Sequence, residues 1–313
     1  LSGGDLRKSI LSGSKLTSSI RKSYFKNPTF LFKDSYKEEQ VKNIFLENRF
    51  DIIPVVDKKH KLVNILEWSN FFDTKPLDQY DFSYTPVVIM AGGKGVRLQP
   101  FTSVLPKPLI PVDDKPIIEH IIEKFTDVGC KNFSLTINYK GNIMKAYFDE
   151  LAPDYNVSFI DEVNPLGTAG SLRFLKGRLK QSFFVTNCDI VVKTDYTSLM
   201  ETHIKNNNDI TLVASAKEYI IPYGTCELNN DGGLSHINEK PKYDFLINTG
   251  LYILNPDILK LIPKNKFYHI THLIEDAKNI GKKVGIYPID DTSWFDVGEW
   301  AEYKKTVKSL NQF

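Results

Sequence analysis

A loop rich in glycine and proline at residues 91–108 carries the groups best suited to binding phosphate. Gly92, Gly93 and Gly95 let backbone N–H groups approach phosphate oxygens closely, because no Cβ stands in the way. Arg97 and Lys107 place two permanent cations on the same loop. Arginine grips phosphate with paired hydrogen bonds, whereas lysine acts as a point charge. This combination predicts a site for a phosphorylated ligand.

The spacing of these glycines excludes two common nucleotide-binding motifs. It fits neither GxGxxG, the dinucleotide-binding pattern, nor GxxxxGK[ST], the P-loop pattern. A hydride-transfer enzyme and a P-loop ATPase are therefore not supported. The plainer alternative is a surface loop with incidental charges. Pro100, Thr102 and Pro106-Lys107-Pro108 in the same window disfavour that alternative.

Two further segments hold candidate functional residues. Asp189 follows the apolar run Phe183-Phe184-Val185, and a carboxylate at a strand end suits a hard divalent cation, which takes oxygen ligands. The alternative for Asp189 is a turn or a helix cap. The small residues of Pro165-Leu166-Gly167-Thr168-Ala169-Gly170 would let the backbone approach a flat base closely. An ordinary helix start is the alternative for this segment.

The elements that must position these residues alternate between strand and helix. We predict strands at 87–91, 133–137, 157–161 and 183–187, helices at 116–128, 141–150 and from about 167, a strand-rich segment at 209–254, and closing helices near 268–280 and 298–310. This order predicts an α/β fold with a doubly wound, mostly parallel sheet. Ligands of such sheets bind at the carboxyl edge, where the glycine-rich loop and Asp189 would both lie.

A smaller unit precedes this sheet. Val41, Ile44 and Phe45 recur at helical spacing, and two short apolar strands follow at 52–57 and 62–66. The stretch 72–81 has no clean periodicity, which is typical of a linker. Because the numbering begins at Leu1 and not at Met, we expect the natural protein to be longer. The basic, serine-containing stretch 6–26 favours a solvated linker or helix face over a transit peptide or a membrane-surface helix.

Composition narrows the class of protein. A formal net charge of +2 gives no global support for a nucleic-acid partner. The three cysteines are scattered, so neither a disulfide framework nor a metal motif is indicated, and a cytoplasmic location fits best. No apolar run has the length of roughly 20 residues that a membrane span needs. We expect a cytoplasmic globular protein with no membrane span.

The window from Gly92 to Pro108 resembles the signature of the sugar-phosphate nucleotidyltransferase family, GGxGxRLxPxTxxxPKP. Every fixed position of that signature is present, and the resemblance extends from about Thr85 to Leu310. It implies a nucleotide-diphospho-sugar transferase fold, which is Rossmann-like. It also implies an enzyme that transfers a nucleoside monophosphate from an NTP to a sugar 1-phosphate, with Mg²⁺ as cofactor. The product would be an NDP-sugar, and pyrophosphate would be released.

The resemblance also assigns roles to single residues. Asp296, in a segment similar to the family's W-x-D-I-G, would complete the metal site with Asp189, although it could also cap the last helix. Glu239-Lys240-Pro241 resembles the family's EKP, and Asn248-Thr249-Gly250 resembles its N-x-G. The implied sets are catalytic Arg97, Lys107 and Asp189; nucleotide-binding Ala91, Gly92, Gly93, Gly95, Gly167, Thr168 and Ala169; sugar-phosphate-binding Gly224, Glu239, Lys240 and Asn248; and metal-binding Asp189 and Asp296.

The amino-terminal unit resembles a CBS domain whose first motif is mostly missing. Leu1–Leu6 looks like the end of that first motif, with Ser2 and Asp5 at its adenosyl-phosphate positions. In the second motif, Asn64, Glu67 and Asn70 depart from the ligand-binding pattern. A structural or dimerising role is therefore as well supported as regulation. The predicted organisation is a CBS domain at 1–75, a linker at 76–84 and a nucleotidyltransferase domain at 85–313.

The resemblance is strongest to bacterial CBS-linked guanylyltransferases that act on glucosamine 1-phosphate or mannose 1-phosphate in surface-glycan or nonulosonic acid biosynthesis. It favours GTP as the NTP and a homo-oligomer, assembled through the CBS unit. Two alternatives remain open at this point. One is a non-catalytic regulatory protein that binds a nucleotide sugar, and the other is an assembly protein driven by the CBS unit. The sequence alone fixes neither the base nor the sugar.

Overall fold

The computed structural model describes residues 21, 28–48, 52–67, 71 and 80–298. The chain divides into two compact units, Leu1–Thr74 and Lys75–Phe313. The predicted first-motif tail at residues 1–6, most of the basic stretch 6–26, Asn70, the linker residues 76–79 and the last helix beyond Gly298 lie outside the described residues.

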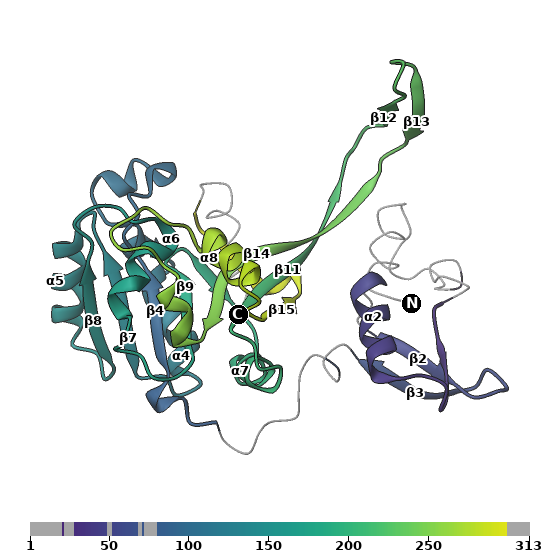
Figure 1. Cartoon of the computed structure of the whole chain (residues 1–313), viewed down its shortest axis with the longest axis horizontal. Helices are drawn as coiled ribbons and strands as arrows, with labels where there is room; N and C mark the ends of the chain where they lie inside the picture. Colours follow the sequence, from purple (N-terminus) through teal and green to yellow (C-terminus); the bar gives the residue numbers. More distant parts are fainter. Residues whose placement is uncertain (1–20, 22–27, 49–51, 68–70, 72–79, 299–313) are drawn as a thin grey trace. The chain divides into compact units, whose positions relative to one another are not determined.

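The amino-terminal unit is a small α+β element (Figure 1). It comprises strand β1 (Leu31–Phe32), helix α2 (Glu38–Asn48), strand β2 (Ile52–Val56) and strand β3 (Leu62–Glu67). The strand order is β1-β2-β3, in which β1 is parallel and β3 antiparallel to β2. The helix and the two longer strands are those expected from the sequence. Assignment of the unit as a CBS domain stays a prediction.

The carboxy-terminal unit is built on a sheet of seven strands. In spatial order they are β15 (Val284–Ile289), β11 (Ile210–Ile220), β14 (Lys242–Leu254), β9 (Phe183–Asn187), β4 (Pro86–Met90), β7 (Asn132–Ile137) and β8 (Asn156–Asp161). Only β14 runs antiparallel to its neighbours, β9 and β11. The predicted mostly parallel sheet is therefore confirmed.

Helices cover both faces of this sheet, as a doubly wound fold requires. They are α4 (Ile117–Thr126), α5 (Gly141–Leu151), the single turn α6 (Gly167–Gly170), α7 (Tyr196–Lys205) and α8 (Ile270–Asn279). In β4, Val87 and Ile89 pack into the hydrophobic cluster that includes α4, α5 and α7. Val88 points the other way, into the cluster that includes α6 and α8. This alternation is what a strand buried on both faces produces.

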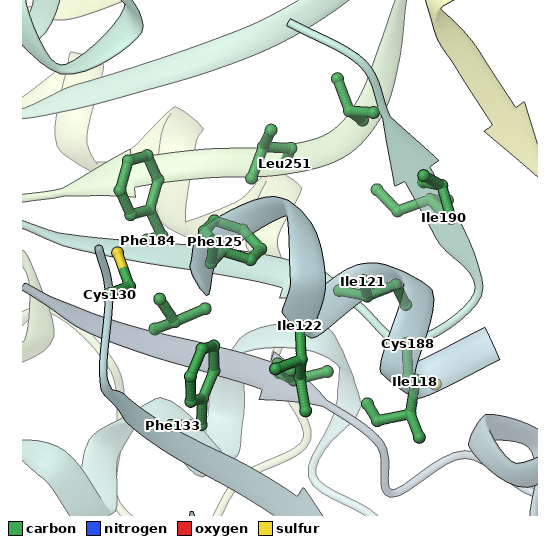
Figure 2. Close-up of a cluster of buried hydrophobic side chains, with 14 of the residues drawn as sticks. Ile118, Ile121, Ile122, Phe125, Cys130, Phe133, Phe184, Cys188, Ile190 and Leu251 are labelled. Carbon is green, nitrogen blue, oxygen red and sulfur yellow. The ribbon is translucent and has the colours of Figure 1, made fainter. Parts of the chain in front are cut away.

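Helix α4 shows how the sequence pattern positions the core. Its five apolar side chains Ile117, Ile118, Ile121, Ile122 and Phe125 form one stripe and are all buried. Figure 2 shows Ile122 and Phe125 beside Phe133 and Phe184 of the sheet. Burial of each such side chain contributes about 1.5–3 kcal/mol. Gly129, whose φ is 99°, takes the chain out of the helix in a conformation that favours glycine.

Short elements complete the unit. They are the 3₁₀ helices η2 (Phe82–Tyr84), η3 (Val96–Leu98), η4 (Phe101–Ser103), η5 (Lys107–Leu109), η6 (Ser171–Leu175), η7 (Pro256–Lys260) and η8 (Asp291–Ser293), and the pairs β5 (Pro111–Val112) with β6 (Lys115–Pro116) and β10 (Ile190–Val192) with β16 (Trp294–Asp296). The helix expected from about 167 is one α-turn followed by η6. Helix α7, strand β15 and the β10–β16 pair were not predicted.

A long hairpin projects from the sheet (Figure 1). The described pairing of β11 with β15 ends at Ser215, and that of β14 with β9 begins at Leu251. Further out, residues 216–220 and 242–246 pair with each other. The hairpin of β12 (Thr225–Leu228) and β13 (Leu234–Asn238) forms the end. We call residues 216–246 the arm.

No helix among the described residues combines the length and the apolar character that crossing a bilayer would require.

Candidate functional site

Two loops leave the sheet at the same edge and bring the predicted residues together. The loop 91–110 follows β4, and Cys188 and Asp189 follow β9. Because β4 and β9 are parallel neighbours with Met90 opposite Asn187, their carboxyl ends lie side by side. This is the edge at which open α/β sheets bind ligands.

The glycine-rich loop is held in one conformation by close contacts. Gly95 has φ of 65°, a left-handed conformation that favours glycine. A Cβ at Gly95 would lie 2.8 Å from Thr102 Cγ2 and 3.1 Å from Lys107 Cβ. The Thr102 hydroxyl donates a hydrogen bond to the Gly95 carbonyl at 3.0 Å. Gly95 therefore lets the chain fold tightly over Lys107, which is only 9% exposed.

Three charged side chains converge beneath Gly298. Lys107 Nζ forms an ion pair with the Asp189 carboxylate. A Cβ built on Gly298 would lie 2.8 Å from Asp189 Oδ2, 2.8 Å from Asp296 Oδ1 and 3.4 Å from Lys107 Nζ. One point in space is thus close to all three groups, although they come from segments far apart in the sequence.

The backbone around Asp296 explains how this convergence arises. The β10–β16 pair sets Asp296 opposite Ile190, next to Asp189. The Val297 N–H donates to the Asp189 carbonyl at 2.9 Å. The Gly298 N–H donates to Asp296 Oδ1 at 2.6 Å. The expected helix cap at Asp296 concerns a helix that lies beyond the described residues.

The pKa of the Asp296 carboxyl depends on its burial and on the charged side chains around it. Burial raises the pKa of its carboxyl above the usual value, and the negative charge of Asp189 raises this pKa further. The positive charges of Lys107 and Arg97 lower the same pKa and so oppose the shift. Arg97, Lys107, Asp189 and Asp296 therefore act on one electrostatic site.

The donor set fits a hard divalent cation. Two carboxylates that face one point repel each other, and this repulsion is one of the causes that raise the pKa of Asp296. A Mg²⁺ ion is commonly held by one or two carboxylates together with substrate phosphates and water. The described residues contain no cluster of three or more His, Cys, Asp or Glu side chains that could form an all-protein metal site. Phosphate oxygens and water would supply the remaining ligands of such an ion.

Glu162, which was not among the predicted site residues, joins two parts of the site. It follows β8, is 7% exposed, and its Oε2 accepts a hydrogen bond from the Leu166 N–H at 3.1 Å. A Cβ at Gly92 would lie 2.9 Å from Glu162 Oε1. Burial raises the pKa of Glu162, and the Leu166 hydrogen bond opposes this shift. Its position at a strand end, the criterion that selected Asp189, could have identified it.

The small residues at 167–170 make a close approach to another part of the protein. A Cβ at Gly167, whose φ is 79°, would lie 2.7 Å from the Tyr268 carbonyl oxygen. The Ala169 N–H donates to that carbonyl at 3.0 Å. Thr168 Oγ1 accepts a hydrogen bond from the Ile270 N–H at 3.0 Å, at the start of α8. Packing against this backbone is therefore one reason for small residues here, besides any contact with a base.

Three other predicted residues lie at the same edge. Ala91 is buried, and its N–H donates to the Thr136 carbonyl at 3.0 Å. Gly93 has open space where a Cβ would stand. Asn248 accepts a hydrogen bond from the Gly250 N–H at 3.1 Å, and a Cβ at Gly250 would lie 2.5 Å from Asn187 Nδ2. Gly250, which follows Asn248 by two positions, therefore lies against the end of β9.

Gly224, Glu239 and Lys240 lie apart from the other predicted site residues of this chain, and their role stays a prediction. They lie on the outer part of the arm and are exposed. The β11–β14 ladder runs from Ala214 opposite Asn248 to Ile220 opposite Lys242. At about 3.3 Å per residue, Lys240 is roughly 25 Å along the strand from Asn248. The straight ladder is the physical reason for the separation.

The fold and the site define an α/β protein with a glycine-rich loop and a pair of carboxylates at the carboxyl edge of its sheet. The family model described as "Nucleotidyl transferase" matches residues 86–312. The chain belongs to this nucleotidyl transferase family.

Two curated relatives of the chain are a mannose-1-phosphate guanyltransferase and a mannose-1-phosphate guanylyltransferase catalytic subunit. The chain is 34% identical to the mannose-1-phosphate guanyltransferase of Yarrowia lipolytica over 68% of its own length and 60% of the relative. It is 33% identical to the mannose-1-phosphate guanylyltransferase catalytic subunit beta of Drosophila pseudoobscura pseudoobscura, over 69% of the chain and 59% of the relative. The chain thus spans about 60% of the length of these relatives.

A solved structure supports the fold. HddC from Yersinia pseudotuberculosis, complexed with GMP-PN, superposes with a TM-score of 0.57 at 24% identity, covering 72% of this chain and 99% of that one. At this identity the likeness concerns the fold.

Proposed function

We propose that this chain is a sugar-1-phosphate guanylyltransferase, which makes a GDP-sugar and pyrophosphate from GTP and a sugar 1-phosphate. The convergence of Lys107, Asp189 and Asp296 on one point at the end of the glycine-rich loop carries the proposal. The curated relatives favour mannose 1-phosphate as the first sugar to test. The same relatives are named as guanyltransferases, which favours GTP as the first nucleotide to test.

The chemistry follows from the charges of the site. A phosphate monoester has a second pKa near 6, so the sugar phosphate attacks as an anion without a strong general base. Its oxygen forms a bond to the α-phosphorus, the bond from that phosphorus to the bridging oxygen breaks, and pyrophosphate leaves with the electron pair. The obstacle is the repulsion between two polyanions. Catalysis therefore depends on positioning and on positive charge.

We assign the binding of the phosphates, the cation and the nucleotide to different residues of the chain. Arg97 and Lys107 would contact phosphate oxygens from the loop, and the backbone at Gly92 and Gly93 would lie against the nucleotide. Asp189 and Asp296 would hold Mg²⁺, which supplies further positive charge to the phosphates when bound. We also propose that Gly224, Glu239, Lys240 and Asn248 form the sugar-phosphate part of the site.

The amino-terminal unit enters the proposal as a separate module. We propose that it is the CBS-type part of the chain, within the boundaries 1–75, and that it serves assembly and not catalysis. The departures at Asn64 and Glu67 from the ligand-binding pattern support this role. A place in surface-glycan biosynthesis remains an expectation from the resemblance.

A matrix of substrates tests the proposed activity. GTP, ATP, UTP, CTP and dTTP are each combined with mannose, glucosamine and glucose 1-phosphates, and pyrophosphate release is measured with and without Mg²⁺. We expect GTP with a hexose 1-phosphate to give the fastest release and EDTA to abolish it. Saturable binding of a nucleotide sugar without pyrophosphate release in any combination would overturn the proposal in favour of a regulatory protein.

A further inference from the structure

The arm has a face with three large aromatic side chains that are each about half exposed, Tyr219, Tyr243 and Phe245. Tyr219 stands opposite Tyr243, and Lys217 stands opposite Phe245, so these four side chains share a face of the ribbon. The rings of Tyr219 and Phe245 lie 6.0 Å apart, and those of Tyr243 and Phe245 lie 6.5 Å apart. Tyr219 is 46% exposed and Phe245 52%. Adjacent exposed rings of this kind mark an interaction surface.

The outer part of the arm extends the exposed apolar surface. Its exposed large apolar side chains are Ile220, Tyr223, Leu228, Leu234 and Ile237. An isolated two-stranded hairpin is marginally stable in water. A ribbon with this much uncovered apolar surface therefore gains stability when another surface covers it.

The turn between β13 and β14 carries two charged residues, Glu239 and Lys240. Lys240 has φ of 49°, a left-handed conformation that fixes the turn between β13 and β14. A Cβ at Gly224 would lie 3.1 Å from Glu239 Oε2, so the carboxylate rests against that glycine. The Ile221 N–H donates to the Pro241 carbonyl at 3.1 Å and closes the base of the turn. No described residue forms an ion pair with Lys240.

Folding the arm back onto its own chain would break the ladder that defines it. Residues 216–220 would have to separate from, or bend together with, residues 242–246. The stretches 214–222 and 241–249 contain no glycine to absorb a sharp bend. The opposite face of the ribbon is further held by the Lys242–Glu218 ion pair at 3.1 Å. A second copy of the chain can receive the arm with this ladder intact.

We propose that two copies of this chain exchange arms, so that Lys240 of each completes the sugar-phosphate site of the other. This inference rests on the proposed function, because it takes the sugar phosphate as the ligand of Lys240. The aromatic face of Tyr219, Tyr243 and Phe245 packs on the partner, beside that partner's glycine-rich loop. The exchange is reciprocal, as a two-fold dimer requires, and each dimer contains two composite sites.

Complementation between two inactive variants tests the exchange. Lys107→Ala removes the cation of the loop, and Lys240→Ala removes the cation of the arm. Chains with different affinity tags are co-expressed, and heterodimers are isolated by two sequential purifications. In an arm-exchanged heterodimer one site carries both lesions and the other carries none. The heterodimer should therefore show about half the activity of the wild-type dimer.

Three outcomes would overturn the exchange. An inactive heterodimer would mean that each arm serves its own chain. Failure of the two tagged chains to co-purify would mean that no dimer forms. Full activity of the Lys240→Ala homodimer would remove Lys240 from the site. Asp296→Asn replaces Lys107→Ala as the loop-side lesion if the buried lysine variant does not fold, as judged by circular dichroism.

A second readout does not depend on activity and so separates this inference from the proposed function. Cys226 lies on the arm and is exposed, whereas Cys130 and Cys188 are buried. A maleimide-benzophenone attached to Cys226 is photoactivated in a mixture of ¹⁴N- and ¹⁵N-labelled chains. We expect mixed-isotope cross-links from residue 226 to peptides of the loop 91–110, and none in Cys226→Ser. Cross-links confined to single-isotope pairs would overturn the exchange even in an active enzyme.

Discussion

At the residue scale, the site depends on charges that are unfavourable until a ligand compensates them. Asp189 and Asp296 face one point beneath Gly298, and Lys107 offsets only part of their repulsion. Arg97 acts on the same point from the loop. In the proposed function, a cation and phosphate groups would bind here together, because each would neutralise the other.

Asp296→Asn should remove most turnover and preserve the fold. The asparagine oxygen can still accept the Gly298 N–H hydrogen bond, but it contributes no charge to the cation. We expect kcat to fall by about 10²–10³-fold and the Mg²⁺ concentration for half-maximal activity to rise. The measurements are pyrophosphate release against Mg²⁺ concentration and circular dichroism.

Asp161→Asn is the matched control for this variant, because the Asp161 side chain is exposed and forms an ion pair with Lys145 at 2.9 Å. Its turnover should stay at the wild-type value. Full activity of Asp296→Asn at ordinary Mg²⁺ concentrations would contradict the assignment of the metal site.

Glu162→Gln should change how stability depends on pH. The pKa of the Glu162 carboxyl is raised in the folded protein, so the folded state holds its proton more tightly than the unfolded state does. This group therefore favours folding below the unfolded pKa of about 4.3, and that contribution is lost as pH rises through the folded pKa. We expect the glutamine variant to be more stable than the wild type at pH 8, because it carries no charge that burial disfavours.

The test of Glu162→Gln is urea unfolding at several pH values between 4 and 8. The advantage of the variant should shrink as the pH is lowered, because the wild-type carboxyl then becomes protonated. An advantage that stays constant across this range would show that burial of the charge is not its cause.

At the element scale, long periodic segments could be predicted from the sequence and short pairings could not. The apolar stripe of α4 and the continuous apolar run of β4 each carry a clear period. The β10–β16 pair has no such signal, because each strand is three residues long and the two are far apart in the chain. Yet this pair is what brings Asp296 to Asp189, so part of the site depends on an element that periodicity cannot reveal.

Helix α7 was not predicted, although the sequence contains a local signal for its start. Its N-cap Asp195 accepts hydrogen bonds from the Thr197 and Ser198 N–H groups, and aspartate is a favoured N-cap residue. The arm was predicted to be strand-rich, and it is. Its direction could not be predicted, because the residues around Tyr223 and Lys240 are compatible with a hairpin that turns back or runs straight. The placement of Glu239 and Lys240 therefore required the structure.

Phe125→Ala should test how far α4 supports the sheet. The Phe125 ring lies 5.2 Å from that of Phe184 on β9 and 4.8 Å from that of Tyr196 on α7 (Figure 2 shows the first contact). Its removal leaves a cavity between three elements, so we expect a loss of about 3–5 kcal/mol in the free energy of unfolding. Denaturant unfolding of the variant measures this loss.

Phe174→Ala is the control for the cavity, because Phe174 is 38% exposed and its loss opens no enclosed space. Its effect should stay below about 1 kcal/mol. Equal losses in the two variants would mean that burial at α4 does not determine stability.

At the scale of the whole molecule, the chain joins two units that each have a hydrophobic core. The amino-terminal core contains Val41, Phe45, Ile53, Val55 and Leu66. The carboxy-terminal unit has the two larger clusters on the faces of its sheet. Separate cores allow separate unfolding, so a single unfolding free energy does not describe such a chain. Small domains bury a smaller fraction of their surface and are correspondingly marginal.

We therefore expect two thermal transitions, of which only the larger responds to the substrate. A ligand that binds the folded form stabilises it by about 2.7 kcal/mol when present at 100 times its Kd. GTP with Mg²⁺ should raise the Tm of the carboxy-terminal transition, and EDTA should remove most of the increase, because in the proposed function the phosphates and the cation would share the Asp189–Asp296 site. AMP and ATP should leave the smaller transition unchanged, since Asn64 and Glu67 do not match the adenine-nucleotide pattern. Differential scanning calorimetry measures both. A shift of the smaller transition by AMP would assign the amino-terminal unit a ligand and a regulatory role, because binding there would couple adenine nucleotides to the stability of that unit.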